Sequence, residues 1–167
     1  GQLPYLEEHI TRKKIIFDCY REGLKDLPVF MNPIPENCSP NYWLSCLMIH
    51  DTAMSQTVRG EQKALYHKEC GKSSPTEILE TLAAFNIEGR PIWKPMHMQP
   101  IYRNSVFVTY QGVARGQSNA YVEEGEAIDR GERVFSQGLC LPSDIKMTKE
   151  QQDFIIEIIK KCFQYRI

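Results

Sequence analysis

Residues 138–163, GLCLPSDIKMTKEQQDFIIEIIKKCF, decide the fold prediction for this chain. Leu139–Leu141 is a short apolar run, which is typical of a buried strand. Thr148 and Gln151 have the spacing of a capping box, in which each side chain bonds to the backbone amide of the other residue, so a helix is predicted to begin there. The apolar face of that helix recurs at helical spacing and comprises Phe154, Ile155, Ile158, Ile159, Cys162 and Phe163. A short strand followed by an amphipathic helix predicts helices packed on a small sheet.

Further helices are predicted upstream of this stretch. Residues 6–25 carry an apolar stripe, mostly at three- or four-residue steps, formed by Leu6, Ile10, Ile16, Tyr20 and Leu24. A second helix is predicted to start at Ser74, because Ser74 suits the N-cap, Pro75 the first helical position, and Glu77 a bond back to the cap amide. Its apolar stripe is Ile78, Leu79, Leu82 and Phe85. A third helix is predicted over residues 126–137, ended by Gly138.

The strands are predicted from short apolar runs at residues 43–49, 87–93 and 106–110. Residues 28–42 contain four prolines and predict irregular backbone, and the polar residues 50–73 predict a loop or insertion. The expected class is therefore α/β, in its α+β-like form. We expect a few-stranded, mainly antiparallel sheet, covered on one side by the helices that start near residues 6, 74 and 148.

Composition excludes several kinds of partner. The 167 residues carry 20 basic and 21 acidic side chains, so the net charge of −1 offers nucleic acid or an anionic membrane no electrostatic attraction. No apolar run is long enough to span a bilayer. The first residues lack both a Met and the features of a signal peptide, so we expect the chain to begin inside a longer protein or after a removed tag.

The cysteines indicate a reducing, cytoplasmic compartment. Six are present at irregular spacing, and Cys46, Cys140 and Cys162 have apolar neighbours, as buried reduced thiols do. Cys140, between two leucines, is interpreted as a structural thiol rather than a nucleophile. His67 and Cys70 would supply only two of the four ligands of a structural zinc site, so no metal site is predicted.

The segment from Gly89 to Pro100, GRPIWKPMHMQP, has the composition of a polar ligand site. Its three prolines fix the backbone, and preorganised groups lose little entropy on binding. Lys94 could hold a phosphate by charge, His97 and Gln99 could bond hydroxyl or amide groups, and Trp93 could stack on a ring. From composition alone a second interpretation stays open, in which the segment is a surface turn with Trp93 as a core anchor.

Residues 90–100 also resemble the signature of the DegT/DnrJ/EryC1/StrS aminotransferase family. Asn86–Glu88 precedes the signature as in that family. Gly138–Ser143 is similar to the family's late motif, and residues 148–152 open the last helix in the same way. Residues 6–24 are similar to the helix that links the family's two domains. The resemblance runs from about residue 3 to about residue 165, and its nearest branch is the bacterial enzymes that aminate UDP-linked 4-keto-6-deoxy sugars for exopolysaccharide or glycan synthesis.

The resemblance implies a domain of a larger enzyme. In the family, pyridoxal phosphate forms a Schiff base with a lysine of a large N-terminal domain, glutamate supplies the amine, and members are usually homodimers. Residues 1–167 then correspond to the C-terminal small domain, and the large domain is missing from this sequence. The resemblance therefore implies no catalytic residue and no bound cofactor in this chain, and it assigns Trp93, Lys94, His97 and Gln99 to the nucleotide-linked sugar.

Two departures from the family pattern bear on substrate choice. Residues 51–73 and 111–124 look longer than the corresponding family loops. A hypothesis of a different class also stands: a freestanding, non-catalytic module that binds sugar nucleotides or a protein partner. The upstream reading frame distinguishes the two, because an in-frame large domain with a cofactor lysine favours the enzyme.

Overall fold

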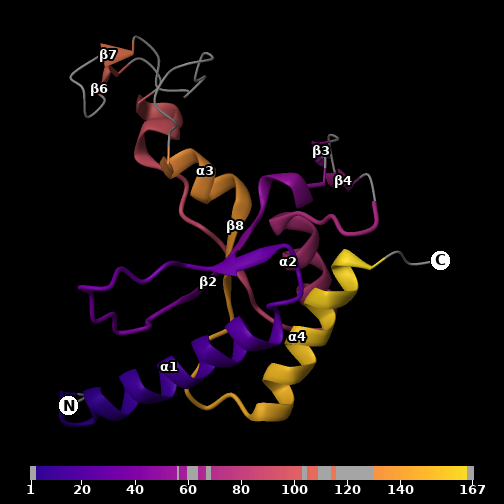
Figure 1. Cartoon of the computed structure of the whole chain (residues 1–167). Coiled ribbons are helices and arrows are strands. Elements are labelled where there is room, and N and C mark those ends of the chain that lie inside the picture. Colours follow the sequence, from indigo (N-terminus) through magenta and orange to yellow (C-terminus); the bar gives the residue numbers. More distant parts are fainter. Residues whose placement is uncertain are drawn as a thin grey trace. The chain divides into compact units, whose positions relative to one another are not determined.

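The computed structural model describes residues 3–55, 57–59, 64–66, 69–102, 105–108, 114–115 and 130–164. The chain forms two compact units, one of residues 1–91 and 137–167 and the other of residues 92–136. The first unit holds a four-stranded sheet and the long helices (Figure 1). Over the described ranges, no helix combines the length and apolar character needed to cross a membrane.

The sheet is antiparallel and has the strand order β1-β2-β8-β5. Its strands are β1 (Val29–Met31), β2 (Ser45–Ile49), β5 (Arg90–Pro91) and β8 (Gly138–Leu141). Strand β8, the last in sequence, lies between β2 and β5, and Cys140 is paired with both Cys46 and Arg90. The late motif of the sequence is therefore inserted between strands that are far from it along the chain.

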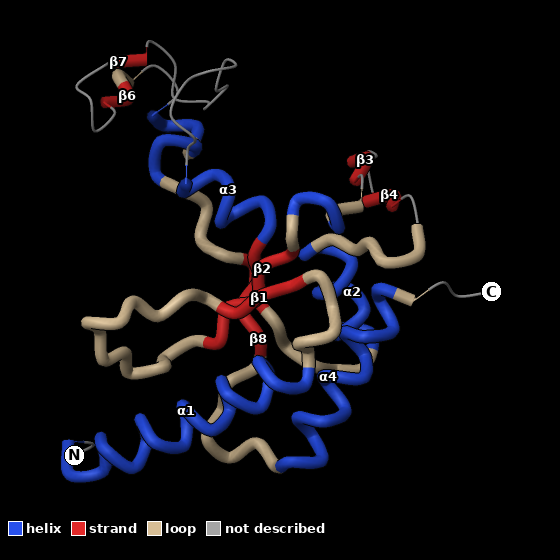
Figure 2. The backbone as a smooth tube through the Cα atoms, in the orientation of Figure 1, coloured by secondary structure: helices blue, strands red, loops and turns tan. Residues whose placement is uncertain are grey.

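Three helices pack on one face of this sheet: α1 (Leu6–Gly23), α2 (Pro75–Ala84) and α4 (Lys149–Phe163) (Figure 2). Successive residues of a strand face opposite sides, so alternate strand residues point at the helices. The strand side of the core is Val29, Met31, Leu47, Ile49, Leu139 and Leu141, and the helix side includes Ile16, Phe17, Tyr20, Ile78, Leu82, Ile155 and Ile159. The predicted antiparallel sheet with helices on one side is confirmed.

The two predicted helix caps differ in detail. Thr148 and Gln151 make both bonds of the capping box at the start of α4, as predicted. Ser74 caps α2 by accepting from the Glu77 amide at 3.1 Å. The Glu77 carboxylate was predicted to accept a hydrogen bond from the Ser74 amide. It accepts one from the buried Ser73 hydroxyl instead, at 3.0 Å. A buried carboxylate needs a hydrogen-bond donor, and the Ser73 hydroxyl provides it.

Helix α1 is buried only in its second half. Ile16 and Phe17 are in the core, whereas Leu6, predicted to belong to the same apolar stripe, is 45% exposed. The core contact is made where α1 ends. A Cβ on Gly23 would lie 2.6 Å from Cδ1 of Ile156, so the absence of a side chain there lets α1 approach α4 closely.

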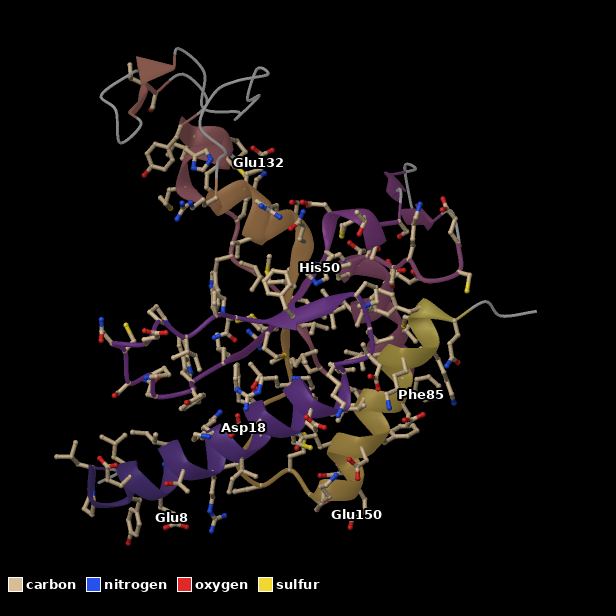
Figure 3. The ribbon with its side chains drawn as sticks, viewed as in Figure 1. Glu8, Asp18, His50, Phe85, Glu132 and Glu150 are labelled. Carbon is tan, nitrogen blue, oxygen red and sulfur yellow. The ribbon has the colours of Figure 1, made fainter. Side chains whose placement is uncertain are left out.

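Two aromatic residues of the predicted stripes are also exposed. Phe85, at the end of α2, and Phe154, in the second turn of α4, each expose half of their surface. Their rings meet edge to face with centroids 5.7 Å apart, and Figure 3 shows Phe85 beside α4. The two rings therefore cover each other in part outside the core cluster.

Several short elements were not predicted. Strand β1 lies inside the proline-rich stretch, and residues 50–73 contain the 3-10 turn η2 (Asp51–Ala53) and the hairpin β3 (Thr57–Arg59) and β4 (Ala64–Tyr66). A strand of three residues is too short to display a period, so pattern alone does not reveal it.

Other predicted elements are shorter than expected. The strand predicted over residues 87–93 is reduced to β5, because Pro91 has no N–H to continue the ladder. Within residues 106–110 the described strand is β6 (Phe107–Val108), which pairs with β7 (Ala114–Arg115). Helix α3 (Arg130–Gln137) represents the helix predicted over 126–137. Residues 109–110 and 126–129 lie outside the described residues.

Candidate functional site

The predicted ligand segment starts from a fixed point at the sheet edge. Arg90 and Pro91 form the edge strand β5, where a proline is tolerated because the free edge needs no donor. The Arg90 guanidinium binds Glu88 Oε1, at 2.9 Å from Nε and 2.6 Å from Nη2. At Gly89 a Cβ would lie 2.7 Å from Cδ2 of Leu79, so α2 packs directly against the backbone here. The strand and the helix together fix the backbone of residues 89–91, which end this part of the first unit.

Residues 95–102 form two consecutive 3-10 turns, η3 (Met96–Met98) and η4 (Pro100–Tyr102). Pro95 precedes the first turn with φ −54°, close to the value its ring fixes, and Pro100 opens the second. Backbone bonds of 3.0 Å run from the amides of Met98, Gln99 and Tyr102 to the carbonyls of Pro95, Met96 and Gln99. The segment is thus a hydrogen-bonded structure whose prolines remove donors that it would otherwise have to satisfy.

The four residues of the predicted site lie on or directly beside the first of these turns. Trp93 and Lys94 precede it, His97 lies in it, and Gln99 follows it. Lys94 is exposed and Trp93 is 64% exposed, whereas His97 and Gln99 are partly buried. The Gln99 side-chain amide donates to the carbonyl oxygen of Lys94 at 3.2 Å, which closes the turn across five residues. In this arrangement Gln99 holds the backbone of Lys94, and the ammonium group of Lys94 projects from a fixed base.

The exposure of Trp93 bears on the alternative in which it anchors the core. Trp93, Met96 and Ile101 are 64%, 63% and 82% exposed, so this turn presents a concentration of apolar surface next to the charge of Lys94. Single exposed apolar side chains are common on protein surfaces, but several close together mark a contact surface. Trp93 is therefore not a core residue within this chain.

A second group of residues, missed from the sequence, holds the late motif in place. The Tyr20 hydroxyl donates to the carbonyl oxygen of Pro142 at 2.9 Å, and the Lys13 ammonium donates to the carbonyls of Ser143 and Trp43. Both donors come from α1, which precedes the late motif by more than a hundred residues. Both residues lie in the stretch that resembles the family's interdomain helix, and the apolar stripe included Tyr20 but not Lys13, but neither signal indicated these bonds.

These contacts also decide whether the described residues fit pyridoxal phosphate. A Schiff-base lysine must offer a neutral amine to the cofactor, which burial favours. Burial lowers the pKa of Lys13, but its ammonium is committed to two backbone carbonyls. Hydrogen bonds to carboxylates raise the pKa of Lys14, Lys25 and Lys149 instead. The described lysines that show a shifted pKa are therefore unsuited to hold the cofactor as a Schiff base.

A cleft of about 440 Å³ lies elsewhere, in the first unit, between α1 and the β1 edge of the sheet. Its walls include Phe17, Arg21, Met31 and Ile34. Arg21 is also paired with Asp18 at 2.9 Å. The cleft contains none of the four predicted site residues, so its size does not make it the candidate site.

The chain matches the model of the DegT/DnrJ/EryC1/StrS aminotransferase family over residues 1–160. The putative pyridoxal phosphate-dependent aminotransferase EpsN of Bacillus subtilis is 29% identical over 165 residues, 98% of this chain and 34% of EpsN. Among solved structures, the putative sugar aminotransferase Spr1654 of Streptococcus pneumoniae superposes with a TM-score of 0.66 at 19% identity, over 97% of this chain and 32% of that one. DesI, solved in the presence of its TDP-sugar product, gives a TM-score of 0.66 at 17% identity, over 96% and 33%.

The chain spans about a third of the length of these relatives. The match nevertheless includes the signature turn, the late motif and most of the final helix. Because it extends over 160 of 167 residues, the chain belongs to the DegT/DnrJ/EryC1/StrS aminotransferase family.

Proposed function

We propose that this chain is the C-terminal small domain of a pyridoxal-phosphate-dependent aminotransferase that transfers an amino group from glutamate to a nucleotide-linked keto-sugar. The observation that carries the proposal is the family match over residues 1–160. The name of EpsN supports the cofactor, and the TDP-sugar product of DesI supports a nucleotide-linked substrate. A cytoplasmic homodimer, each subunit with its own large domain, completes the proposal.

The cofactor belongs to the large domain in this proposal. When bound, pyridoxal phosphate supplies the electron sink for amine transfer, and the protein orients it. In the family the Schiff-base lysine lies in the large N-terminal domain, so it is assigned there in this enzyme too, and Lys13, which donates to two backbone carbonyls, is given a structural role. The part left to the small domain is recognition of the sugar nucleotide.

The turn at residues 92–102 is the proposed recognition element. A diphosphate carries negative charge that a cation can meet, and Lys94 projects from backbone that Gln99 fixes. The exposed indole of Trp93 offers a flat apolar surface to a base or sugar ring. His97 can donate or accept a hydrogen bond at a hydroxyl or phosphate oxygen.

The test is the Lys94→Ala variant of the full-length enzyme. Loss of a charge-assisted contact to the diphosphate should raise KM for the nucleotide sugar by at least roughly tenfold, equivalent to about 1.4 kcal/mol, with little change in melting temperature. Lys161→Ala is the matched control, because Lys161 is an exposed lysine on α4. An unchanged KM together with a lowered melting temperature would mean that the turn is structural and that the substrate binds elsewhere.

The cofactor assignment has a separate test. The 167-residue chain is incubated with pyridoxal phosphate, reduced with borohydride and mapped by peptide mass spectrometry. We expect no lysine to be labelled stoichiometrically and no aminotransferase activity. Specific labelling of one lysine would overturn the assignment of the Schiff base to the large domain.

A further inference from the structure

Two cysteines from distant parts of the sequence face each other across the sheet. Cys46 on β2 is the register partner of Cys140 on β8, and their sulfur atoms are 3.9 Å apart. We propose that Cys46 and Cys140 form a reversible disulfide between β2 and β8 when a peroxide oxidises the two thiols. This inference does not depend on the proposed function, because it rests on the sheet of the first unit alone.

The backbone around Cys46 shows that the pair has the separation a disulfide needs. The Cys46 amide donates to the Asn32 side chain at 3.0 Å, and its carbonyl accepts from the Asn32 amide at 2.9 Å. Both backbone groups of Cys46 therefore point toward β1 and away from Cys140. Cys46 and Cys140 are a non-hydrogen-bonded pair, for which the Cα atoms of antiparallel strands are about 4.5 Å apart. That separation lies within the range of about 4.4–6.8 Å seen in disulfides.

The remaining movement is small. The sulfur atoms must approach by about 2 Å to reach the bond length of a disulfide, and rotation about the Cα–Cβ bonds can supply this without moving the strands. Leu47, Leu139 and Leu141 point into the helix-covered core, so the two cysteines lie on the opposite face. Bond formation therefore leaves the main core undisturbed. On this side of the sheet Figure 3 shows His50 at the end of β2.

The two thiols differ in ways that suit successive roles. Cys46 is partly exposed and accessible to a small oxidant, whereas Cys140 is 4% exposed. The contact between the two sulfur atoms lowers the pKa of Cys140 and raises that of Cys46, which burial raises further. Access to the oxidant, and not thiolate character, assigns the first step to Cys46, because Cys46 is the more exposed of the two. A thiolate is the nucleophile in sulfur exchange, so Cys140, with the lower pKa, is suited to the second, resolving step.

The reaction balances with one peroxide. The Cys46 sulfur attacks a peroxide oxygen, the O–O bond breaks, and one water leaves as Cys46 becomes a sulfenic acid. The Cys140 sulfur then attacks the Cys46 sulfur, the S–O bond breaks, the S–S bond forms, and a second water leaves. The two thiols have lost two protons and two electrons, both taken up by the peroxide. A dithiol reductant reverses the reaction by exchange.

The test uses the reduced wild-type chain treated with a small excess of hydrogen peroxide. Remaining thiols are alkylated, and peptides are mapped without reduction. We expect a cross-linked peptide pair containing Cys46 and Cys140. Dithiothreitol should reduce the disulfide and separate the two peptides. The exposed thiols Cys38 and Cys70 are the internal control for oxidant reactivity. Recovery of Cys46 and Cys140 as alkylated thiols under conditions that oxidise Cys38 and Cys70 would overturn the proposal.

Stability gives an independent readout. The link would close a loop between residues 94 apart, which in the chain-entropy treatment of disulfides raises the melting temperature by about 5 °C or more. Cys46→Ser should lose both the cross-link and the increase, and Cys38→Ser should keep both. If Cys46→Ser does not fold, Cys46→Val, which suits a strand, replaces it. If peroxide still raises the melting temperature of a variant that lacks Cys46, the proposed pair is contradicted.

Discussion

Replacing Tyr20 with phenylalanine tests how α1 holds the late motif. Tyr20 has no exposed surface, and its hydroxyl donates to the Pro142 carbonyl at 2.9 Å. Burial raises the pKa of Tyr20 above its ordinary value of 10.0, because the phenolate would lose its hydration inside the core. Tyr20→Phe removes both the hydrogen bond and the ionisation, and these two losses act at different pH values.

The expected magnitudes follow from the hydrogen bond and from proton linkage. Near neutral pH the variant loses one buried hydrogen bond, so it should be less stable by about 1 kcal/mol. Above pH 10 the unfolded wild type releases the phenolic proton while the folded state retains it, so stability that is complete below that pH is lost as pH rises. By about pH 11 the loss amounts to roughly 1.4 kcal/mol. The variant should then equal or exceed the wild type in stability.

The assay is urea unfolding followed by far-UV circular dichroism at a series of pH values from neutral to alkaline. Other titrating groups are common to both chains and cancel in the difference. Tyr5→Phe is the control, because Tyr5 is 58% exposed, and it should differ from the wild type by less than about 0.5 kcal/mol throughout. A difference for Tyr20→Phe that stays constant across this range would refute the buried-phenol argument.

Three further substitutions test the packing, again by urea unfolding. Thr148→Ala removes the cap of α4 and should cost about 1 kcal/mol; no change would mean that the first turn is held by packing alone. Ile159→Ala, at a fully buried position, should cost about 2–5 kcal/mol, whereas Ile15→Ala, 63% exposed, should cost less than about 0.5 kcal/mol; equal losses would contradict the assigned core. Gly89→Ala places a Cβ 2.7 Å from Leu79 and should cost about 1–3 kcal/mol unless Leu79 can move aside, which a neutral result would indicate.

The elements predicted correctly are those whose signal is local. The capping box at Thr148 and the apolar repeat of α4 depend on residues three or four apart in the sequence, and both are present in the structure. Strand β8 was found because an unbroken apolar run is buried on both faces. Strand β1 and the hairpin of β3 and β4 were not predicted from the sequence. Strands of three residues are defined by pairing with a partner strand and not by a pattern of their own.

The candidate site shows the same division. Its prolines and its mixture of Trp93, Lys94, His97 and Gln99 mark it in the sequence as a rigid polar turn. The hydrogen bond from Gln99 to the Lys94 carbonyl required the folded turn, and so did the exposure of Trp93. The role of Lys13 was out of reach, since nothing in its surroundings along the chain points to carbonyls at residues 43 and 143.

By itself the sequence determined which residues form the helices, where α4 begins, and to which family the signature turn is similar, because propensity, capping and motif spacing are properties of neighbouring residues. The tertiary structure alone decided the strand order, in which β8 enters between β2 and β5, and with it the pairing of Cys46 with Cys140. It also decided which side chains of each apolar stripe are covered, leaving Phe154 exposed and Tyr20 buried. Those outcomes depend on contacts between segments far apart in the sequence, by 130 residues in the case of Lys13 and Ser143, for which a local pattern carries no information.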